Sequence, residues 1–383
     1  MPGLINAHTH GPMSLFRGMA DDLALDEWLN QHIWPAEAHW VNEEFVHTGS
    51  QLAIAEMLRS GTTCFNDMYF FPDVTARIAR DIGIRACIGL ICIDFPSAWA
   101  NNAHEYIDKG LELRDHYRSD SLIHTPFAPH APFTVSDEPL NRIRVLADEM
   151  DLPIHIHVHE TAGEIEQSLK QTGKRPLERL NDLGLVSPNL MAVHFTQTTD
   201  EEIALMAESG SHVVHCPESN LKLASGFCPV KKLMDAGVNV ALGTDGAASN
   251  NDLNMLGEMH TASLLAKGVS LDATALTAMQ TVRMATINGA KALGIDNITG
   301  SLEAGKFADI IAVDFSSLEM QPVYDPVANL VYSSNREQIS DVWVAGRHLL
   351  KDRELTTLNE ADLIRKTQEW NVKISEYDTK QAK

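Results

Sequence analysis

Short apolar runs bounded by turn residues recur along the first 250 residues of the chain. There are eight of them, at residues 3–10, 62–68, 84–93, 122–130, 152–160, 189–196, 210–217 and 238–246. Runs of this length are typical of buried strands. The segments between most of them, such as 43–59, 136–150 and 200–209, carry apolar residues three and four apart and are predicted to be helices. Strands that alternate with helices indicate an α/β fold with a parallel sheet, and eight repeats predict a closed (β/α)8 barrel of the TIM type.

The pattern changes after residue 300. Residues 300–314 and 339–354 look like short strands joined by Gly-containing turns, and an amphipathic helix is predicted at about 360–376. We therefore expect a barrel over residues 1–300, part of a small β domain over 301–355, and a C-terminal helix and tail over 356–383. A small sheet needs several strands to be stable alone. The small domain is thus expected to be a β-sandwich that is incomplete on its N-terminal side, with its partner strands preceding Met1.

A long segment, roughly residues 11–42, separates the first two predicted strands and is rich in Trp, His and acidic residues. Loops that follow barrel strands build the active sites of such folds. The segment is therefore a candidate lid or substrate wall. The alternative is an inserted helical pair that only packs against the barrel.

Composition narrows the class of protein. Hydrophobic residues make up 44% of the chain and charged residues 21%, which is enough apolar material for a large core. The net charge is −22, so a nucleic acid would be repelled. The five cysteines lack CxxC spacing, and this usage favours a reduced, cytoplasmic setting. We find neither a signal peptide nor a membrane span of ~20 apolar residues. A small-molecule ligand and a homo-oligomer, dimer or tetramer, are expected.

Polar side chains that suit metal or acid–base chemistry end most of the predicted strands. In a barrel of this type the carboxyl ends of the strands meet at one mouth. The residues at these ends are His8, His10, His130, His157, Glu160, His194, His215 and Asp245. A single histidine at a strand end is usually structural, but eight such groups at one mouth predict a site.

Three imidazoles and one carboxylate, those of His8, His10, His157 and Asp245, form a candidate site for one divalent metal ion, with Zn²⁺ favoured and one position open for water. His8 and His10 lie two residues apart, so a strand places both rings on the same side. His155 and His159 share the parity of His157, so alternation alone does not select the ligand; we choose His157 because it leaves room for Glu160 on the following turn.

A second metal would need a bridging lysine or carboxylate after the third or fourth run. Neither run contains a lysine, and only Asp94 follows the third. One metal is therefore favoured. We interpret His47 and His212 as structural or surface residues.

The residues beside this site predict a hydrolase. A metal ion lowers the pKa of bound water from near 16 to roughly 7. The carboxylate of Glu160 is placed to carry protons as general acid and base, and His194 with Asp245 to hold or deprotonate the attacking water.

At these residues the sequence resembles the amidohydrolase superfamily, and most closely its 5′-methylthioadenosine/S-adenosylhomocysteine deaminases. The resemblance covers essentially the whole chain. Its most specific segments are PGLINAHTH (2–10), SLFRGMADDLALDEWLNQHIWPAEA (14–38), APHAPFTVSDE (128–138), HVHET (157–161) and LGTDGAASNN (242–251). Family members usually have β strands before the first of these motifs, whereas here the motif begins at the N-terminus.

The resemblance implies a function and a role for each residue. His8, His10, His157 and Asp245 would bind the metal, and Glu160 and His194 would transfer protons. Glu37 and His130 would contact the substrate, Glu37 through the ribose hydroxyls, while Ser249 would lie close to the base. The reaction implied is hydrolytic loss of ammonia from carbon 6 of adenine, which converts 5′-methylthioadenosine, S-adenosylhomocysteine, adenosine or 5′-deoxyadenosine to the inosine analogue.

Two other functions compete with this interpretation. One is another deaminase or chlorohydrolase of the same superfamily, acting on guanine, a pyrimidine or a triazine. Glu37 argues against it, because a carboxylate placed for neighbouring hydroxyls suits a nucleoside. The other is a barrel that binds ligands without catalysis, which a metal assay would distinguish. The sequence does not rank the four nucleosides, because loop shape decides how the 5′ group is accommodated.

Overall fold

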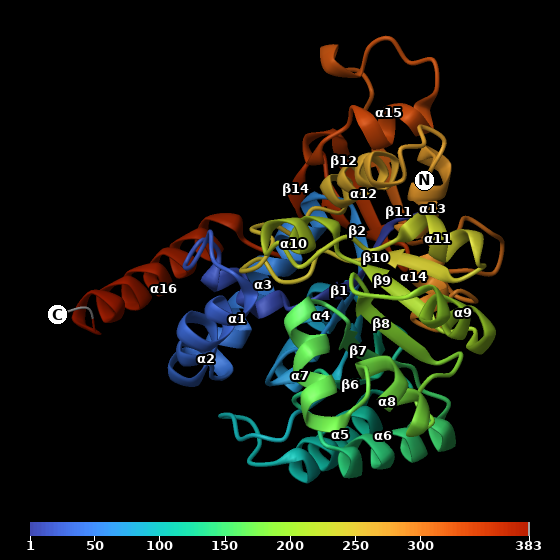
Figure 1. Cartoon of the computed structure of the whole chain (residues 1–383). Coiled ribbons are helices and arrows are strands. Elements are labelled where there is room, and N and C mark those ends of the chain that lie inside the picture. Colours follow the sequence, from blue (N-terminus) through green and yellow to red (C-terminus); the bar gives the residue numbers. More distant parts are fainter. Residues whose placement is uncertain (382–383) are drawn as a thin grey trace.

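The computed structural model describes residues 1–381, and the side chains of residues 1–375. All eight apolar runs form strands of one parallel barrel in the centre of the molecule (Figure 1). The strands are β1 (Leu4–Thr9), β2 (Thr62–Asp67), β3 (Arg85–Ile88), β4 (Leu90–Cys92), β5 (Ile123–His124), β6 (Phe127–Pro129), β7 (Ile154–Val158), β8 (Leu190–His194), β9 (His212–His215) and β10 (Asn239–Leu242). The predicted barrel is confirmed.

Two of the apolar runs are each broken into two short strands. The third run gives β3 and β4, which are separated by Gly89, and the fourth gives β5 and β6. At Gly89 the backbone N–H donates to the carbonyl of Asp67, and a Cβ there would lie 2.6 Å from that oxygen. Only glycine permits this close approach, which turns the strand toward its next neighbour. The breaks leave two hydrogen-bonded groups of strands, one of four and one of six, which together form the wall of the barrel.

The barrel closes between its last and first strands. The Asp245 N–H donates to the carbonyl of His8 at 3.0 Å, and the Thr244 N–H donates to the side chain of Asn6. Gly243 makes this contact possible, because a Cβ at that position would lie 2.8 Å from the His8 backbone nitrogen. The closing contact therefore ties the residue after β10 to the first histidine of β1.

Helices surround the barrel (Figure 1). They are α3 (Glu43–Arg59), α4 (Pro72–Ile82), α5 (Ala103–Tyr117), α6 (Asp137–Met150), α7 (Ala162–Thr172), α8 (Pro176–Asp182), α9 (Asp200–Ser209), α10 (Pro217–Lys222), α11 (Val230–Asp235), α12 (Met255–Ser270), α13 (Ala278–Met284) and α14 (Ile287–Ala292). The predicted helices at 43–59 and 200–209 are confirmed to the residue. Their starts are set by local caps: the side chain of Asn42 accepts the N–H of Phe45, and Thr199 forms a capping box with Glu202.

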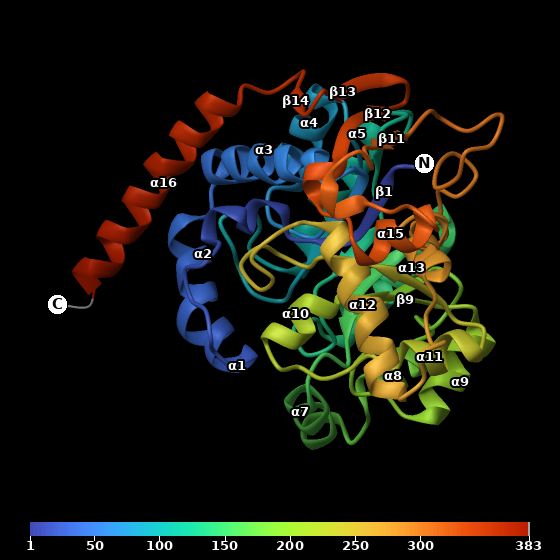
Figure 2. The same cartoon turned by 90° about the horizontal axis from the view of Figure 1, so that it is seen from above.

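The segment after β1 is helical and stands beside the barrel (Figure 2). It contains the 3₁₀ turn η1 (Gly11–Phe16), α1 (Leu25–Glu27), the π turn η2 (Trp28–Ile33) and α2 (Trp34–Trp40). Trp28 and Ile33 are buried, whereas Trp34 and Glu37 are only partly covered. The segment thus packs on the barrel through one face and leaves other side chains for the mouth.

The small domain is an antiparallel sheet of β11 (Ile310–Val313), β12 (Ile339–Val344), β13 (Arg347–Lys351) and β14 (Glu354–Leu355), with α15 (Pro326–Tyr332) and the 3₁₀ turns η3 (Leu318–Met320) and η4 (Arg336–Gln338). It is joined to the barrel by the buried ion pair of Arg85 and Asp309, at 2.8 Å. Met1 and Pro2 pair with β11, where the Ile311 N–H donates to the Met1 carbonyl. The boundaries at 300 and 355, and partner strands before Met1, stay predictions.

The C-terminal helix α16 (Glu360–Gln381) runs along the outside of α3 and extends beyond it (Figure 2). Trp370 is buried against α3, with its ring 5.3 Å from that of Phe45. Arg59 of α3 pairs with Glu360 at 2.7 Å. Within the part of the chain that the structure describes, no helix has the length and apolar character needed to cross a membrane.

Candidate metal and active site

The polar side chains at the strand ends gather around one cavity of ≈110 Å³ at the mouth of the barrel. His10, His130, His157, His194, Glu160, Asp245 and Ser249 all line this cavity, and so does Glu37 of α2. His8 lies directly behind them and is fully buried. The structure therefore brings together all the predicted site residues except His215, which belongs to the buried barrel interior.

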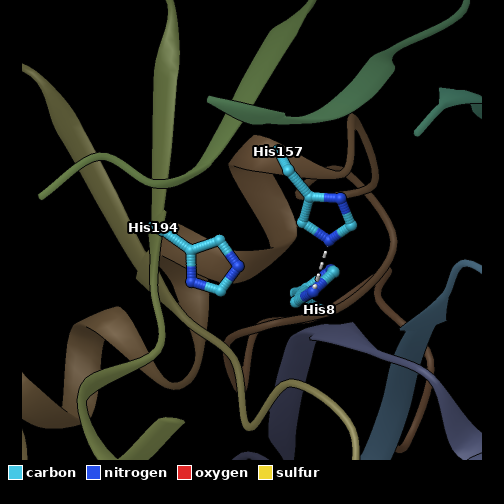
Figure 3. A group of neighbouring side chains, drawn as sticks. All are labelled: His8, His157 and His194. Atoms are coloured by element: carbon cyan, nitrogen blue, oxygen red, sulfur yellow. Dashed lines mark hydrogen bonds between the residues drawn. The ribbon is translucent and has the colours of Figure 1, made fainter. Parts of the chain in front are cut away.

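The rings of His8, His10, His157 and His194 all turn Nε2 toward the cluster, because a neighbouring group contacts each Nδ1. The Nδ1 atoms face these groups: His8 faces His155 Nε2 at 2.9 Å, His10 the Met68 carbonyl at 2.5 Å, His157 the His130 carbonyl at 2.7 Å, and His194 the Asn220 side-chain oxygen at 2.8 Å. The oxygen acceptors that face His10, His157 and His194 place a proton on each Nδ1 and turn Nε2 toward the cluster, whereas either ring can donate in the His8–His155 pair. Figure 3 shows His8, His157 and His194 meeting in this way.

The donor atoms have the spacing of a coordination shell. His8 Nε2 lies 3.2 Å from His157 Nε2, and both His8 Nε2 and His10 Nε2 lie 3.3 Å from Asp245 Oδ1. Ligands at about 2.1 Å from a tetrahedral ion are separated by roughly 3.4 Å. Lone pairs facing each other at this distance repel unless a cation lies between them. The residues present therefore fit a divalent metal ion, and His194 Nε2 lies close enough to complete a group with His8 and His157.

The protonation states of His8 and His157 agree with that assignment. Burial lowers the pKa of His8 to about 4, and it lowers the pKa of His157 well below the usual value. Both rings are therefore neutral at pH 7, as metal ligands must be. Burial by itself would lower the pKa of His10, but its hydrogen bond and attraction to Asp245 raise that pKa to about 9, so a metal ion bound there would displace a proton from the ring. Burial by itself would raise the pKa of Asp245, but hydrogen bonds from His10 and His8 hold it well below its ordinary range, so this side chain is a carboxylate.

Backbone strain marks two of these positions. His194 has φ 72° and Asp245 has φ 63°, in the left-handed region that residues other than glycine rarely adopt. Such a conformation costs about 1–3 kcal/mol and persists only where the surroundings enforce it. Each residue ends or follows a strand, so the backbone turns its side chain out of the strand direction and into the mouth.

The second oxygen of Asp245 is held by two hydroxyls. Ser219 donates to Oδ2 at 2.6 Å and Ser249 donates to it at 2.9 Å. These bonds leave Oδ1 facing the histidines. Ser249 therefore lies against the carboxylate of Asp245 while it also lines the cavity.

Glu160 lies beside the histidine cluster. Its Oε2 is 3.7 Å from His194 Nε2, and the Ser225 hydroxyl is 3.5 Å from Oε1. Burial raises the pKa of this carboxyl, which suits a group that must both accept and donate a proton near neutral pH. The geometry therefore allows Glu160 to serve an atom bound in the cavity without being a ligand in the cluster.

Glu37 and His130 also line the cavity. The His130 Nδ1 lies 3.0 Å from the hydroxyl of Thr134, and its ring centroid is 5.0 Å from that of His157. Burial lowers the pKa of His130 to about 3, so the ring is neutral. Burial raises the pKa of Glu37 to about 7, and Tyr69 lies beside its carboxyl.

Three buried supports were not foreseen from the sequence. His155 holds His8, Asn220 holds His194, and Glu164 holds the backbone of Glu160. Only Glu164 had a sequence signal: TAGE at 161–164 has the spacing of a capping box. The Thr161 hydroxyl does accept the Glu164 N–H. The Glu164 carboxylate, however, accepts the N–H groups of His159 at 3.1 Å and Glu160 at 2.6 Å instead.

Other candidates lie outside the site. His159 stacks on Phe195 and accepts the N–H of Leu177, so its ring faces away from the cluster. Asp94 accepts the N–H of Ser136 rather than reaching the histidines. The single-metal interpretation is therefore supported by the arrangement of the described residues.

Replacing Glu164 by Gln is expected to lower kcat about tenfold and to destabilise the fold by roughly 1–3 kcal/mol, because a carboxamide offers one acceptor where two N–H groups need partners. Glu166→Gln is the matched control, since Glu166 is exposed on the same helix. Steady-state kinetics and thermal melting of both variants test this. Equal behaviour of the two variants would show that Glu164 does not position Glu160.

Comparison with known proteins agrees with this geometry. The amidohydrolase family model matches residues 1–349. The chain belongs to the amidohydrolase family. A 5-methylthioadenosine/S-adenosylhomocysteine deaminase of Teredinibacter turnerae is 55% identical over 374 residues, which cover 98% of this chain and 85% of the relative.

Two further amidohydrolase relatives extend the comparison. A 5′-deoxyadenosine deaminase of Methanothermobacter thermautotrophicus is 46% identical over 94% of this chain and 84% of its own length. The crystal structure of an adenosine deaminase from Xanthomonas campestris with bound zinc superimposes with a TM-score of 0.97 and 55% identity, over 98% of this chain and 86% of that one. The resemblance noted in the sequence and the expected fold class are confirmed.

Proposed function

We propose that this amidohydrolase is a metal-dependent deaminase of adenosine-type nucleosides, with 5′-methylthioadenosine and S-adenosylhomocysteine as the candidate substrates. The observation that carries the proposal is the convergence of the His8, His10, His157 and His194 rings and Asp245 beside the carboxyl of Glu160, in a cavity that Glu37 also lines. Named deaminases at 46–55% identity support it. A non-catalytic barrel would have no need for this arrangement.

We infer that His8, His10, His157 and Asp245 hold one divalent ion, and zinc is proposed because nitrogen donors with one carboxylate suit it. When bound, the ion supplies hydroxide near neutral pH. His194 and Asp245 orient the attacking water, and Glu160 delivers a proton to ring nitrogen 1. The proton given to nitrogen 1 comes from the attacking water. A bond from its oxygen to carbon 6 forms, Glu160 carries the second water proton to the amino nitrogen, the bond from carbon 6 to that nitrogen breaks, and ammonia leaves.

Glu37 is proposed to hold the sugar. Its carboxylate can accept hydrogen bonds from two neighbouring ribose hydroxyls, while His130 and Ser249 lie near the base. A bare guanine or a triazine offers no such hydroxyls, so Glu37 favours nucleoside deamination over the competing activities. The test of the function is ammonia release, or the absorbance change from adenine to hypoxanthine, across the four nucleosides and guanine.

Replacing Glu37 by Ala is expected to lower kcat/KM for the riboside by about ten- to a hundredfold, because hydrogen bonds to a charged group contribute roughly 1.5–3 kcal/mol. Any weak action on adenine itself should be nearly unchanged. The 2′,3′-dideoxy analogue, assayed with both proteins, is the control. Equal impairment on that analogue would mean that Glu37 acts through loop structure.

The same carboxyl predicts a pH dependence. Burial raises the pKa of Glu37 to about 7, so its charged form is lost as the pH falls through neutrality. The ratio of kcat/KM for the riboside to that for the dideoxy analogue should therefore rise with pH around 7, since other titrations affect both substrates equally. In Glu37→Gln this ratio should be flat. A ratio independent of pH in the wild-type protein would contradict the role.

Two broader expectations remain proposals. We place the protein in the cytoplasm, which its five buried, unpaired cysteines support. We also propose a homo-oligomer, dimer or tetramer, which light scattering of the purified protein would test. The net charge of −22 supports a small-molecule substrate and argues against nucleic acid.

A further inference from the structure

We propose that the sugar end of this site selects an uncharged, apolar 5′ substituent, so that a 5′-methylthio nucleoside is turned over much faster than one with a homocysteine arm. This inference rests on the proposed function, because it takes Glu37 as the group that binds the ribose. It ranks substrates that the sequence left unranked.

The walls around Glu37 are apolar and include several aromatic rings. Besides its polar groups, the active-site cavity is lined by apolar side chains, among them Leu25, Trp28, Trp34, Phe70, Ile93 and Phe95. Most of the side chains near Glu37 come from the segment after β1 and from the loop after β4. A substituent that leaves the sugar on this side therefore meets hydrocarbon.

A second cavity continues beyond Glu37. It has a volume of ≈220 Å³ and shares Trp34, Glu37, Phe70 and Phe95 with the first. Its remaining lining includes Val41 and Pro96. The rings of Trp34 and Phe95 meet edge to face with centroids 6.0 Å apart, at the junction of the two cavities. The 5′ carbon is bonded to the 4′ carbon, which neighbours the carbon that bears the 3′-hydroxyl. A nucleoside whose hydroxyls are held by Glu37 therefore brings its 5′ group to this junction.

In the described part of the chain, the two cavities offer a carboxylate no Lys or Arg partner. Their formally charged side chains, apart from the histidines, are Glu37, Glu160, Glu164 and Asp245, and no Lys or Arg is among the described residues that line them. The homocysteine arm carries one carboxylate and one ammonium group. In the second cavity, away from the metal ligands, its carboxylate would lose water with no Lys or Arg in the described lining to pair with, and burial of an unpaired charge is strongly unfavourable.

Cations do exist in the neighbouring groove, but they are engaged. Arg179 pairs with Asp137 at 2.6 Å and donates to the carbonyl of Val135, and Lys174 pairs with Asp182. Phe133 lines both this groove and the active-site cavity. An arm that reached the groove would have to displace existing ion pairs, so the groove offers no ready site for the carboxylate.

The first experiment compares kcat/KM for 5′-methylthioadenosine, 5′-deoxyadenosine, adenosine and S-adenosylhomocysteine on the metal-loaded protein. We expect the methylthio substrate to exceed the homocysteine one by at least about a hundredfold, since the latter must bury a charge. If none of the four is deaminated, the proposed function fails. If all are deaminated and the homocysteine substrate is equal or better, the function stands and this inference is overturned.

The second experiment changes the wall. Phe95 is 43% exposed, so Phe95→Arg places a cation at the junction without burying it in the core. The ratio of kcat/KM for the homocysteine substrate to that for the methylthio substrate should rise at least tenfold. Phe95→Leu should leave that ratio near the wild-type value. This variant shows whether a change in the ratio comes from the added charge or from the loss of the aromatic ring.

A matched charge control lies elsewhere on the surface. Phe227 is 52% exposed and lines neither cavity, so Phe227→Arg adds the same charge away from the site. In this variant the ratio of kcat/KM for the homocysteine substrate to that for the methylthio substrate should equal the wild-type value. A ratio that is unchanged in Phe95→Arg, or that rises equally in Phe227→Arg, would overturn the assignment of this wall to the 5′ substituent.

Discussion

Replacing Glu160 by Gln is expected to leave the metal bound and to lower kcat by about 10²- to 10⁴-fold, the range that general acid–base catalysis contributes. The carboxamide keeps the size and the hydrogen-bonding atoms of the side chain but cannot shuttle a proton. Glu160 is 3.7 Å from His194 Nε2 and is not among the groups that cluster as metal ligands. Its loss should therefore affect turnover without affecting the ion.

Two measurements on the same sample make that prediction decisive. Elemental analysis should give the wild-type metal content, and the melting temperature should change little. Glu166→Gln, an exposed position on α7, is the control for loss of one negative charge. Activity of Glu160→Gln near that of this control would make Glu160 structural, and the proton donor would then have to be another group.

Replacing Asp245 by Ala should abolish both metal binding and turnover. Asp245 supplies the only carboxylate of the proposed ligand set and lies 3.3 Å from the Nε2 atoms of both His8 and His10. Without it the ion loses its one anionic ligand and the attacking water loses the carboxylate proposed to orient it, so metal affinity and turnover both fall. We expect a loss of at least about 10³-fold in kcat/KM, beyond that of a typical single proton-transfer group.

The corresponding control and readout are independent of catalysis. Metal at a thousand times its Kd stabilises a folded protein by about 4.1 kcal/mol, so adding zinc to metal-free wild-type protein should raise the melting temperature. The same addition should not stabilise Asp245→Ala, whereas Asp235→Ala, an exposed change on α11, should respond like the wild type. Full activity in a wild-type preparation free of metal would refute the metal site itself.

Local patterns account for what could be predicted from the sequence. The helix at 200–209 begins where Thr199 and Glu202 form a capping box, and each of these signals lies within four residues. Strand ends could be located for the same reason, and the barrel then places His8, His157 and Asp245 together without further information.

What could not be predicted depends on contacts between distant segments. His155 and His157 lie on the same side of one strand. Only the position of His8 decides their roles: His155 contacts the Nδ1 of His8, whereas His157 faces its Nε2. The role of Glu164 was hidden in a similar way, since its sequence spacing indicated a cap. The wall formed by Trp34 and Phe95 joins residues 61 positions apart, which no local pattern reports.

The helical segment after β1 has an evolutionary consequence. The groups proposed to carry the chemistry stand on strand ends and their immediate turns, whereas much of the wall around the 5′ position stands on α1, η2 and α2, beside the barrel. Changes in residues 25–41 can therefore accumulate without disturbing the groups on the strands, except at Glu37. Grafting this segment from another amidohydrolase, with Glu37 retained, would be a direct way to transplant substrate preference onto an unaltered reaction centre, and it marks where related proteins with different preferences should diverge first.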